Sequence, residues 1–204
     1  GDAPHVRGAM GRFTEQGVVA RRDRSPDELI NEIHESTTKR RTVLLDNPPS
    51  DGSAKPDLVF GGVGWDWNTL LRNRPLDVWM HEQDVRRAVG RPGNLDSPGA
   101  RHTTDYLLDA LPIIVGKRVA PPAGTTVTLA VAGSAERTVE IGEDGRGRLV
   151  EASTADRAEP TVRIEMDRED FIVLAGGRRD PQQVRVIGDE VLGTRVLETY
   201  RTTP

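Results

Sequence analysis

Apolar residues and one threonine recur every three or four positions between residues 26 and 45, and this spacing predicts an amphipathic helix there. These positions are Leu29, Ile30, Ile33, Thr37 and Leu44. The start of the helix is marked by Ser25 as N-cap, Pro26 in the first turn and Glu28 as the third helical residue, which together form a capping box. The mixed residues 1–24 keep no clean helical period, and we assign no element to them.

Two further helices are predicted in the first half of the chain. The first covers residues 69–89 and is closed by Gly90, a residue type that commonly ends helices. Three apolar residues of this helix lie seven positions apart, and we predict that they form the face that packs against a helical bundle: Leu71, Val78 and Val85. The next helix starts at Ser97 and runs to about residue 111, where Pro112 is expected to kink or end it.

The period of the pattern changes from helical to alternating after a Pro/Gly linker at residues 121–124. Strands are predicted around residues 126–131, 139–141, 149–150, 162–166 and 184–186. One helix over about residues 167–174 ends at a Gly-Gly pair, and a last helix begins near Asp189. The pattern therefore predicts an all-helical domain over residues 1–118 and an α+β domain over residues 119–204.

Composition narrows the classes of function. The 204 residues carry a formal net charge of −4, which argues against a nucleic-acid-binding protein. No apolar run approaches 18 residues and the N-terminus has no signal-peptide pattern, so we expect a cytoplasmic protein without a membrane partner. The chain has no cysteine, which excludes disulfides, thiolate metal sites and a cysteine nucleophile. Any thiol chemistry must therefore use the sulfur of a small molecule.

The residues best suited to chemistry lie in the helix predicted over residues 69–89. Asp77, His81 and Asp84 fall within about 60° of one another around the helix axis. A carboxylate and an imidazole one turn apart can bind one divalent ion such as Zn, Ni, Co or Fe. Asp84 is either a further ligand or the acceptor that fixes the His81 tautomer. The same three residues also fit an ordinary ion pair on a helix surface.

A complete catalytic metal site usually has at least three protein ligands. The candidates for a third ligand are His34, on the capped helix, and His5, and both are expected to be exposed. We assign no catalytic acid, base or nucleophile.

Several segments resemble one known family. The stretch at residues 73–92, from Asn73-Arg74-Pro75 to Gly90-Arg91-Pro92, resembles the mycothiol-dependent maleylpyruvate isomerase family. The helix start at residues 25–29 and the segments 174–181 and 186–193 are similar to it as well. The resemblance implies an N-terminal DinB-like helical bundle of the four-helix type. It also implies a small C-terminal α+β domain similar to sterol carrier protein 2.

The resemblance also implies cofactors. Family members hold a divalent metal, zinc first among the candidates, through a His on an early helix and an acid–His pair on a later helix. The later pair corresponds to Asp77 and His81, with Asp in place of the Glu of the isomerase type. No residue corresponds to the early His, so the first helix is expected to be missing and the metal site incomplete in this chain. In this scheme the metal lowers the pKa of the mycothiol thiol, and the thiolate attacks an electrophilic carbon.

Two functions remain open. The first is a metal-dependent isomerase or transferase that uses mycothiol on a small electrophilic substrate. Arg86 and Arg87, with Arg91 nearby, would hold an anionic group of the cofactor or substrate, although solvated arginines fit the pattern too. The second is a non-catalytic ligand-binding or regulatory protein that kept the fold and lost the complete metal site. A monomer or homodimer is expected in both cases.

Overall fold

A computed structural model describes residues 4, 6, 8–57, 64–150 and 159–201. The chain divides into two compact units, Gly1–Asn73 and Arg74–Pro204. The division falls inside helix α3 (Trp67–Ala88), one residue before Pro75, which lacks the N–H of a normal helical residue. Most of α3 therefore belongs to the C-terminal unit. The predicted boundary after residue 118 stays a prediction.

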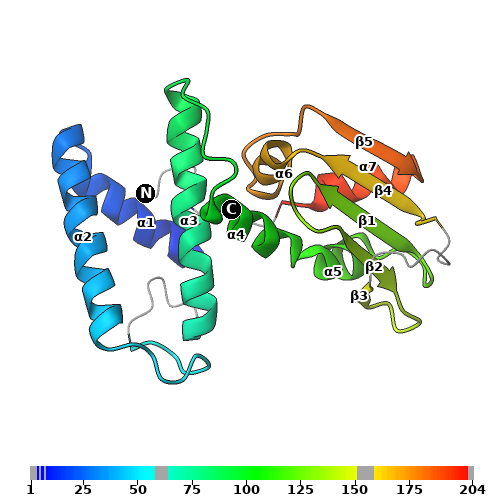
Figure 1. The fold of residues 1–204 in the computed structure, drawn as a ribbon, viewed down its shortest axis with the longest axis horizontal. Coiled ribbons are helices and arrows are strands. Elements are labelled where there is room, and N and C mark those ends of the chain that lie inside the picture. The colour runs from blue at the N-terminus through cyan, green and yellow to red at the C-terminus, as the bar shows by residue number, and fades with distance from the viewer. Residues whose placement is uncertain (1–3, 5, 7, 58–63, 151–158, 202–204) are drawn as a thin grey trace. The chain divides into compact units, whose positions relative to one another are not determined.

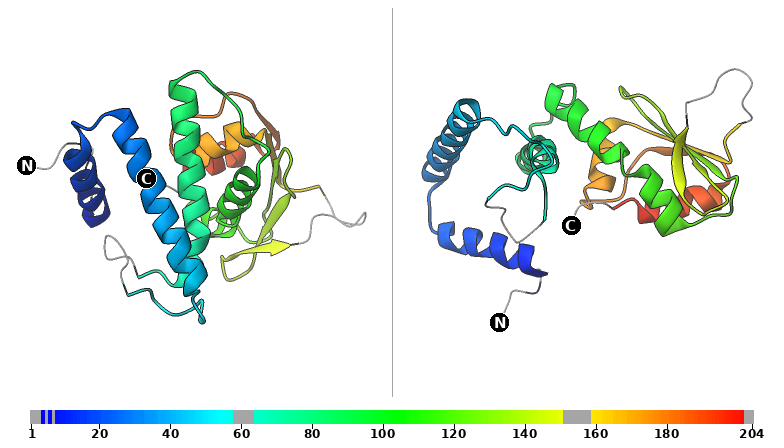
Figure 2. Two further views of the ribbon diagram at one scale, coloured as in Figure 1. Left: turned by 60° about the vertical axis from the view of Figure 1, so that its left-hand side comes forward. Right: turned by 90° about the horizontal axis from the view of Figure 1, so that it is seen from below.

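The N-terminal unit contains helices α1 (Gly8–Arg21) and α2 (Pro26–Asp46), joined by a short turn (Figure 2). The predicted capping box is confirmed: the Glu28 N–H donates to Ser25 Oγ at 3.3 Å, and the Ser25 N–H donates to Glu28 Oε2 at 2.7 Å. Across the turn, the Arg21 guanidinium donates to the Glu32 carboxylate at 2.6–3.0 Å. This exposed ion pair links the end of α1 to the first turns of α2.

Helix α1 corrects the sequence reasoning, which assigned no element to residues 1–24. Its apolar residues do not gather on one face, and none of its described side chains is buried. Without a buried stripe there is no periodic signal to detect. Helix α2 has no buried side chain either, although its period is clear: Ile30 and Ile33 are exposed.

The C-terminal unit continues from α3 into helical segments and a five-stranded mixed sheet (Figure 1). After α3 come α4 (Pro98–Leu108), α5 (Leu111–Ile113) and the π-helical turn η2 (Ile114–Val119). The strands are β1 (Thr126–Val131), β2 (Arg137–Ile141), β3 (Gly147–Val150), β4 (Val162–Met166) and β5 (Val184–Gly188). Helix α6 (Arg168–Ala175) joins β4 to β5, and α7 (Glu190–Thr199) follows β5. The predicted α-plus-α+β class is confirmed.

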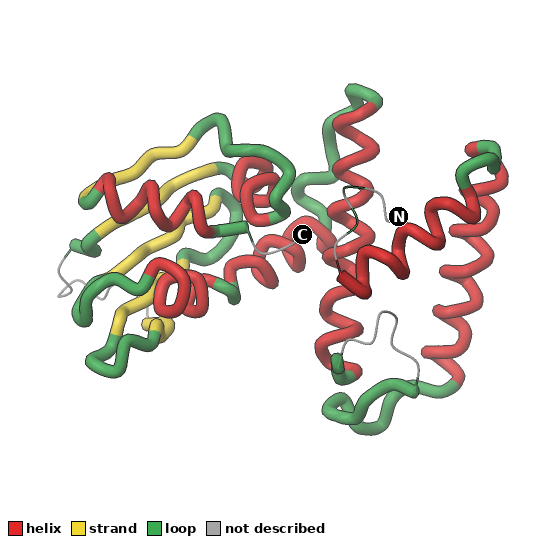
Figure 3. The backbone as a smooth tube through the Cα atoms, turned by 180° about the vertical axis from the view of Figure 1, so that it is seen from behind, coloured by secondary structure: helices red, strands yellow, loops and turns green. Residues whose placement is uncertain are grey.

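Strand order in the sheet is β3-β2-β1-β4-β5. Only β1 and β4 run parallel among the described pairs, with Val127 opposite Val162 and Ala130 opposite Glu165. Helical segments lie on one face of the sheet (Figure 3): α5 and η2 contact β2 and β3, and α7 contacts β4 and β5. Every second residue of β4 is buried against them, and the alternating residues Arg163 and Glu165 point to the opposite face.

The third predicted helix is shorter than expected. Helix α4 ends at Leu108 rather than near residue 111, and a new helical turn begins at Leu111. Pro112 is the second residue of that turn. A backbone N–H at this position would have no acceptor within the helix, so proline is tolerated there. In the described chain, no helix combines the length and the apolar character needed to cross a membrane.

The buried face of α3 is not the predicted one. Val78 and Val85 are 65% and 63% exposed, and Leu71 is 36% exposed. The side chains that α3 buries are Leu70, Leu76, Trp79, Met80 and Gln83. Both sets of residues have helical spacing, so the period alone does not decide which face packs. Packing of Leu76, Trp79 and Met80 into the core of the C-terminal unit decides it.

Two glycines allow η2 to approach strand β3 closely. A Cβ added at Gly116 would lie 2.4 Å from the Gly147 backbone nitrogen and 3.1 Å from its Cα. Backbone atoms cannot rotate away as a flexible side chain can. The close approach therefore needs glycine at this position.

We predict that Gly116→Ala lowers the free energy of unfolding by about 1–3 kcal/mol, because the added methyl group forces the two backbones apart. Without an overlap, the same change in a helix is stabilising by about 0.5–1 kcal/mol. Chemical denaturation followed by circular dichroism measures the difference. The control is Gly17→Ala in α1, where the nearest atom to the new Cβ is Arg21 Nη1 at 3.6 Å. A Gly116→Ala variant as stable as the parent would contradict the close approach.

Candidate functional site

The three candidate metal ligands, Asp77, His81 and Asp84, lie on the half-exposed face of α3. His81 Nε2 lies 3.7 Å from Asp77 Oδ1, and His81 Nδ1 lies 3.4 Å from Asp84 Oδ2. The side chains of His81 and Asp77 are 67% and 41% exposed. All three belong to the C-terminal unit, whose core holds the opposite face of the helix. The structure thus brings the three residues together as the helical spacing predicts.

Asp84 makes the strongest contacts in the group, and they are with arginines. Its Oδ1 accepts from Arg87 Nη2 at 2.6 Å and from Arg178 Nε at 3.3 Å. Its Oδ2 accepts from Arg178 Nη2 at 3.0 Å. Partial burial alone would raise the pKa of Asp84, but the hydrogen bonds from Arg178 and Arg87 outweigh it, so the pKa lies below its ordinary value. Asp84 is therefore an ionised carboxylate shared by two guanidinium groups.

Arg178 is the residue that the sequence reasoning missed. It follows Gly176-Gly177, a segment interpreted only as a helix end and a turn. Gly176 lies so close to α3 that an added Cβ would be 2.3 Å from Met80 Cε, and Gly177 has a φ of +65°. These two glycines bring the chain against α3 and turn it, so that the next side chain reaches Asp84. The only sequence signal for this contact is a pair of arginines after a Gly-Gly pair.

The loop that carries Arg178 is fixed by a buried carboxylate. Asp170 is 4% exposed and accepts hydrogen bonds from Gln182 N at 2.9 Å, Gln183 N at 2.7 Å and Arg179 Nη1 at 3.1 Å. Burial alone would raise the pKa of Asp170, but these donors outweigh it and hold the pKa below its ordinary value.

The other predicted residues have structural contacts. Arg86 Nε donates to Glu82 Oε1 at 2.7 Å, and Asn94 Nδ2 donates to both oxygens of the same carboxylate. Glu82 therefore helps to hold the loop after α3. Trp79 is buried and its Nε1 donates to the Asn94 carbonyl at 3.1 Å, so it belongs to the core. The cofactor-binding role of Arg86 and Arg87 stays a prediction.

The described residues do not complete a metal centre. Within residues 4, 6, 8–57, 64–150 and 159–201, no three His, Asp or Glu side chains gather closely enough to hold an ion. Asp77 and His81 present two donor groups of the right kind. Asp84 is occupied by two cations that would repel a third. His34 is exposed on α2, and His5 lies outside the described residues.

Comparison with known protein families covers most of the chain. Residues 1–86 match the mycothiol maleylpyruvate isomerase N-terminal domain, and residues 101–194 match the C-terminal domain of the same family. No curated protein matches the chain.

Several solved structures match the second half. A sterol carrier protein-2 like-3 from Aedes aegypti is 18% identical, covers 49% of this chain and 98% of its own, and has a TM-score of 0.33. The sterol carrier protein domain 2 of Helicoverpa armigera is 16% identical over 54% of this chain and 91% of its own, with a TM-score of 0.33. Sterol carrier protein 2 from Yarrowia lipolytica is 12% identical over 51% and 97%, with a TM-score of 0.30.

We predict that Asp170→Asn lowers the free energy of unfolding by about 2–4 kcal/mol at pH 7, because an amide has one acceptor oxygen for three donors and its own NH₂ group would face one of them. The lowered pKa sets the pH dependence. The carboxylate stabilises the fold above the unfolded pKa of about 4, and this stabilisation is lost as the pH falls through the folded pKa.

Denaturation of both proteins between pH 7 and pH 3 checks this prediction. The difference between parent and variant should shrink below about pH 4. The exposed change Asp105→Asn on α4 is the control and should leave the denaturation midpoint unchanged. A difference that stays constant down to pH 3 would contradict a role for the ionised Asp170.

Proposed function

Because the chain belongs to the mycothiol maleylpyruvate isomerase family, we propose that it is an enzyme that uses mycothiol to isomerise or conjugate a small anionic electrophile. The observation that carries the proposal is the polar face of α3. It combines the Asp77–His81 pair with Arg87 and Arg178, both anchored on Asp84. Such a face offers donors for an anion beside a pair of groups suited to a cation.

The two arginines are the anion-binding part of the proposed site. Each guanidinium has five N–H donors, and Asp84 uses one from Arg87 and two from Arg178. Arg178 also donates from Nη1 to the Gly176 carbonyl at 2.5 Å, so Arg87 is the side chain whose further donors would bind a carboxylate of the substrate. Asp84 fixes both side chains in advance, so less rotamer entropy is lost when the anion binds. A dicarboxylate such as maleylpyruvate, which the family name contains, has this chemistry.

The sulfur comes from the cofactor, since the chain has no cysteine. In an isomerisation, the thiolate sulfur bonds to one carbon of the substrate's double bond and the π electrons move to the conjugated carbonyl. The remaining single bond rotates, the electrons return and the C–S bond breaks. In a conjugation the sulfur stays attached. The arginines would hold the substrate's carboxylate in place during the rotation.

Asp77 and His81 are proposed as two ligands of a divalent ion, with zinc as the first candidate. Their donor types fit such an ion, but two ligands do not make a complete centre, and Asp84 is committed to the arginines. For this reason no step of the proposed chemistry is assigned to the metal.

The incomplete ligand set is also the specific observation that favours the second candidate, a ligand-binding or regulatory protein without catalysis. Metal binding separates the two candidates. The cytoplasmic location and the monomeric or homodimeric state stay predictions.

We predict that the purified chain, incubated with zinc, nickel or cobalt and freed of excess, retains about one ion per chain by mass spectrometry. His81→Ala should reduce the content to background and change the free energy of unfolding by less than about 2 kcal/mol, because an exposed side chain adds little packing. His102→Ala on α4 is the control and should retain the ion. No bound ion even with excess metal would refute the metal-dependent enzyme and support the non-catalytic protein.

We predict that Arg178→Gln raises the KM for maleylpyruvate at least about tenfold in a mycothiol-dependent isomerase assay, since it removes a charged hydrogen-bond donor. Arg178→Lys should restore only part of the loss, because an ammonium group lacks the planar fork. The exposed change Arg101→Gln is the control. Unchanged KM in both Arg178 variants would show that this arginine only positions Asp84. Absence of turnover in the parent protein would refute maleylpyruvate as its substrate.

A further inference from the structure

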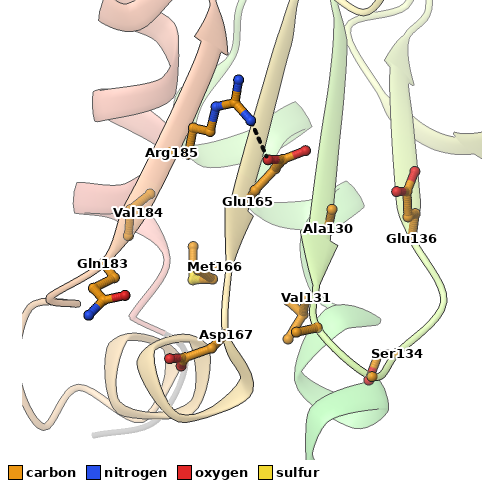
Figure 4. A pocket seen from close by; sticks show the side chains of 12 residues that line it. Ala130, Val131, Ser134, Glu136, Glu165, Met166, Asp167, Gln183, Val184 and Arg185 are labelled. Carbon is orange, nitrogen blue, oxygen red and sulfur yellow. Dashed lines mark ion pairs between the residues drawn. The ribbon is translucent and has the colours of Figure 1, made fainter.

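The open face of the sheet carries a row of four charged side chains. Helical segments contact the other face, while Arg163, Glu165 and Arg185 point outward, because residues directly opposite each other on neighbouring strands share a face. Arg163 Nη1 donates to Glu136 Oε2 at 2.9 Å, and Arg163 Nε donates to Glu165 Oε1 at 2.7 Å. Arg185 Nη1 lies 3.6 Å from Glu165 Oε2 (Figure 4).

The row crosses neighbouring strands and its charges alternate in sign. Glu136 directly precedes β2, Glu165 lies on β4 and Arg185 lies on β5, and strand β1 lies between β2 and β4. The Arg163 side chain therefore passes over β1 to reach Glu136. Across the strands, the charges follow the order negative, positive, negative, positive. Figure 4 shows Glu136, Glu165 and Arg185 along this line.

Small side chains keep the open face flat around the row. The outward residues of β1 are Thr126, Thr128 and Ala130, and Thr138 on β2 lies opposite Thr128. Thr128 and Thr138 are 4% and 8% exposed, and their hydroxyl oxygens lie 2.9 Å apart. Their neighbours thus enclose these two side chains, which do not project from the sheet. Another flat surface can therefore approach this one closely.

We propose that this face binds the same face of a second copy of the chain, about a twofold axis that runs parallel to the strands between β1 and β4. The rotation reverses the order of the row across the strands. Arg163 then faces Glu165 of the second copy, and Arg185 faces Glu136 of the second copy. An order such as negative, positive, positive, negative would oppose like charges. The alternating order opposes only unlike charges, so the row is complementary to itself.

The charges enter this interface as pairs. Glu136, Arg163 and Glu165 are hydrogen-bonded within one chain, so association does not bury an isolated charge, which would be costly. The Arg185 side chain is 75% exposed and its contact with Glu165 is longer than a hydrogen bond, so it can turn to Glu136 of the second copy. This surface is independent of the thiol chemistry proposed on α3.

The size of the face sets the expected strength of the dimer. Five strands about 4.8 Å apart, each about five residues long, give a face of roughly 24 by 16 Å. Two such faces together bury roughly 800 Å², a size that is typical of weak and transient complexes. We therefore expect a dimer that dissociates on dilution.

The test is sedimentation equilibrium of the full chain from about 10 to about 500 µM, the range in which a weak dimer dissociates. The parent should dimerise with a Kd that rises at least about fivefold when sodium chloride is raised from about 50 to about 500 mM, because salt screens the facing charges. A parent that stays monomeric throughout this range would overturn the proposal, and so would a dimer that salt does not weaken.

Charge reversal gives a second measurement. Arg185→Glu and Glu136→Lys each oppose like charges in a homodimer and should raise the Kd at least about tenfold. Mixed in equal amounts, the two variants place unlike charges at both contacts, and the mixture should dimerise about as tightly as the parent. Arg146→Glu in the exposed β2–β3 turn is the matched control and should dimerise as the parent does.

Circular dichroism of each variant shows that it is folded. Folded variants that each dimerise as tightly as the parent would refute the interface. Weakening of both variants without recovery in their mixture would refute the pairing of Arg185 with Glu136 across the twofold axis.

Discussion

The buried carboxylate of Asp170 is the constraint on which the arrangement of the C-terminal unit's polar sites depends. A charge removed from water must be paired, and Asp170 is paired with the backbone of Gln182 and Gln183 and with Arg179. Those partners span the loop between α6 and β5. The far end of the loop is therefore fixed to the first turn of α6, and the chain between must fold back.

The path of that loop determines where the side chain of Arg178 lies. At its beginning, Gly176 and Gly177 allow the chain to pass close to Met80 and turn, which directs Arg178 to Asp84. The loop forms neither a helix nor a strand. It is held in place instead by the three hydrogen bonds that the Asp170 carboxylate accepts.

Sequence reasoning predicted the elements whose signals are local. The capping box at Ser25, the alternation of β1 and β4, and the glycines that end α6 all depend on neighbours within a few residues. Sequence reasoning failed where tertiary packing determines which residues are buried and which side chains meet. Helix α1 buries no side chain and so has no period, and the stripe of Leu71, Val78 and Val85 has the same spacing as the face that is buried. Arg178 lies 94 residues from its partner Asp84, and no local pattern encodes that pairing.

The arginines on Asp84 change what the polar face of α3 means. From the sequence alone, three acidic or imidazole side chains on one helix face fit either a metal site or an ordinary ion pair. In the structure, the Asp84 carboxylate already pairs with two guanidinium cations, so the face separates into a part suited to a cation, Asp77 and His81, and a part suited to an anion, Arg87 and Arg178. An enzyme that joins a thiol to an anionic electrophile would need both parts side by side, whereas a simple structural ion pair does not need an exposed imidazole next to it. This division of charge, more than the number of metal ligands, is what supports the proposal that the face is a reaction site.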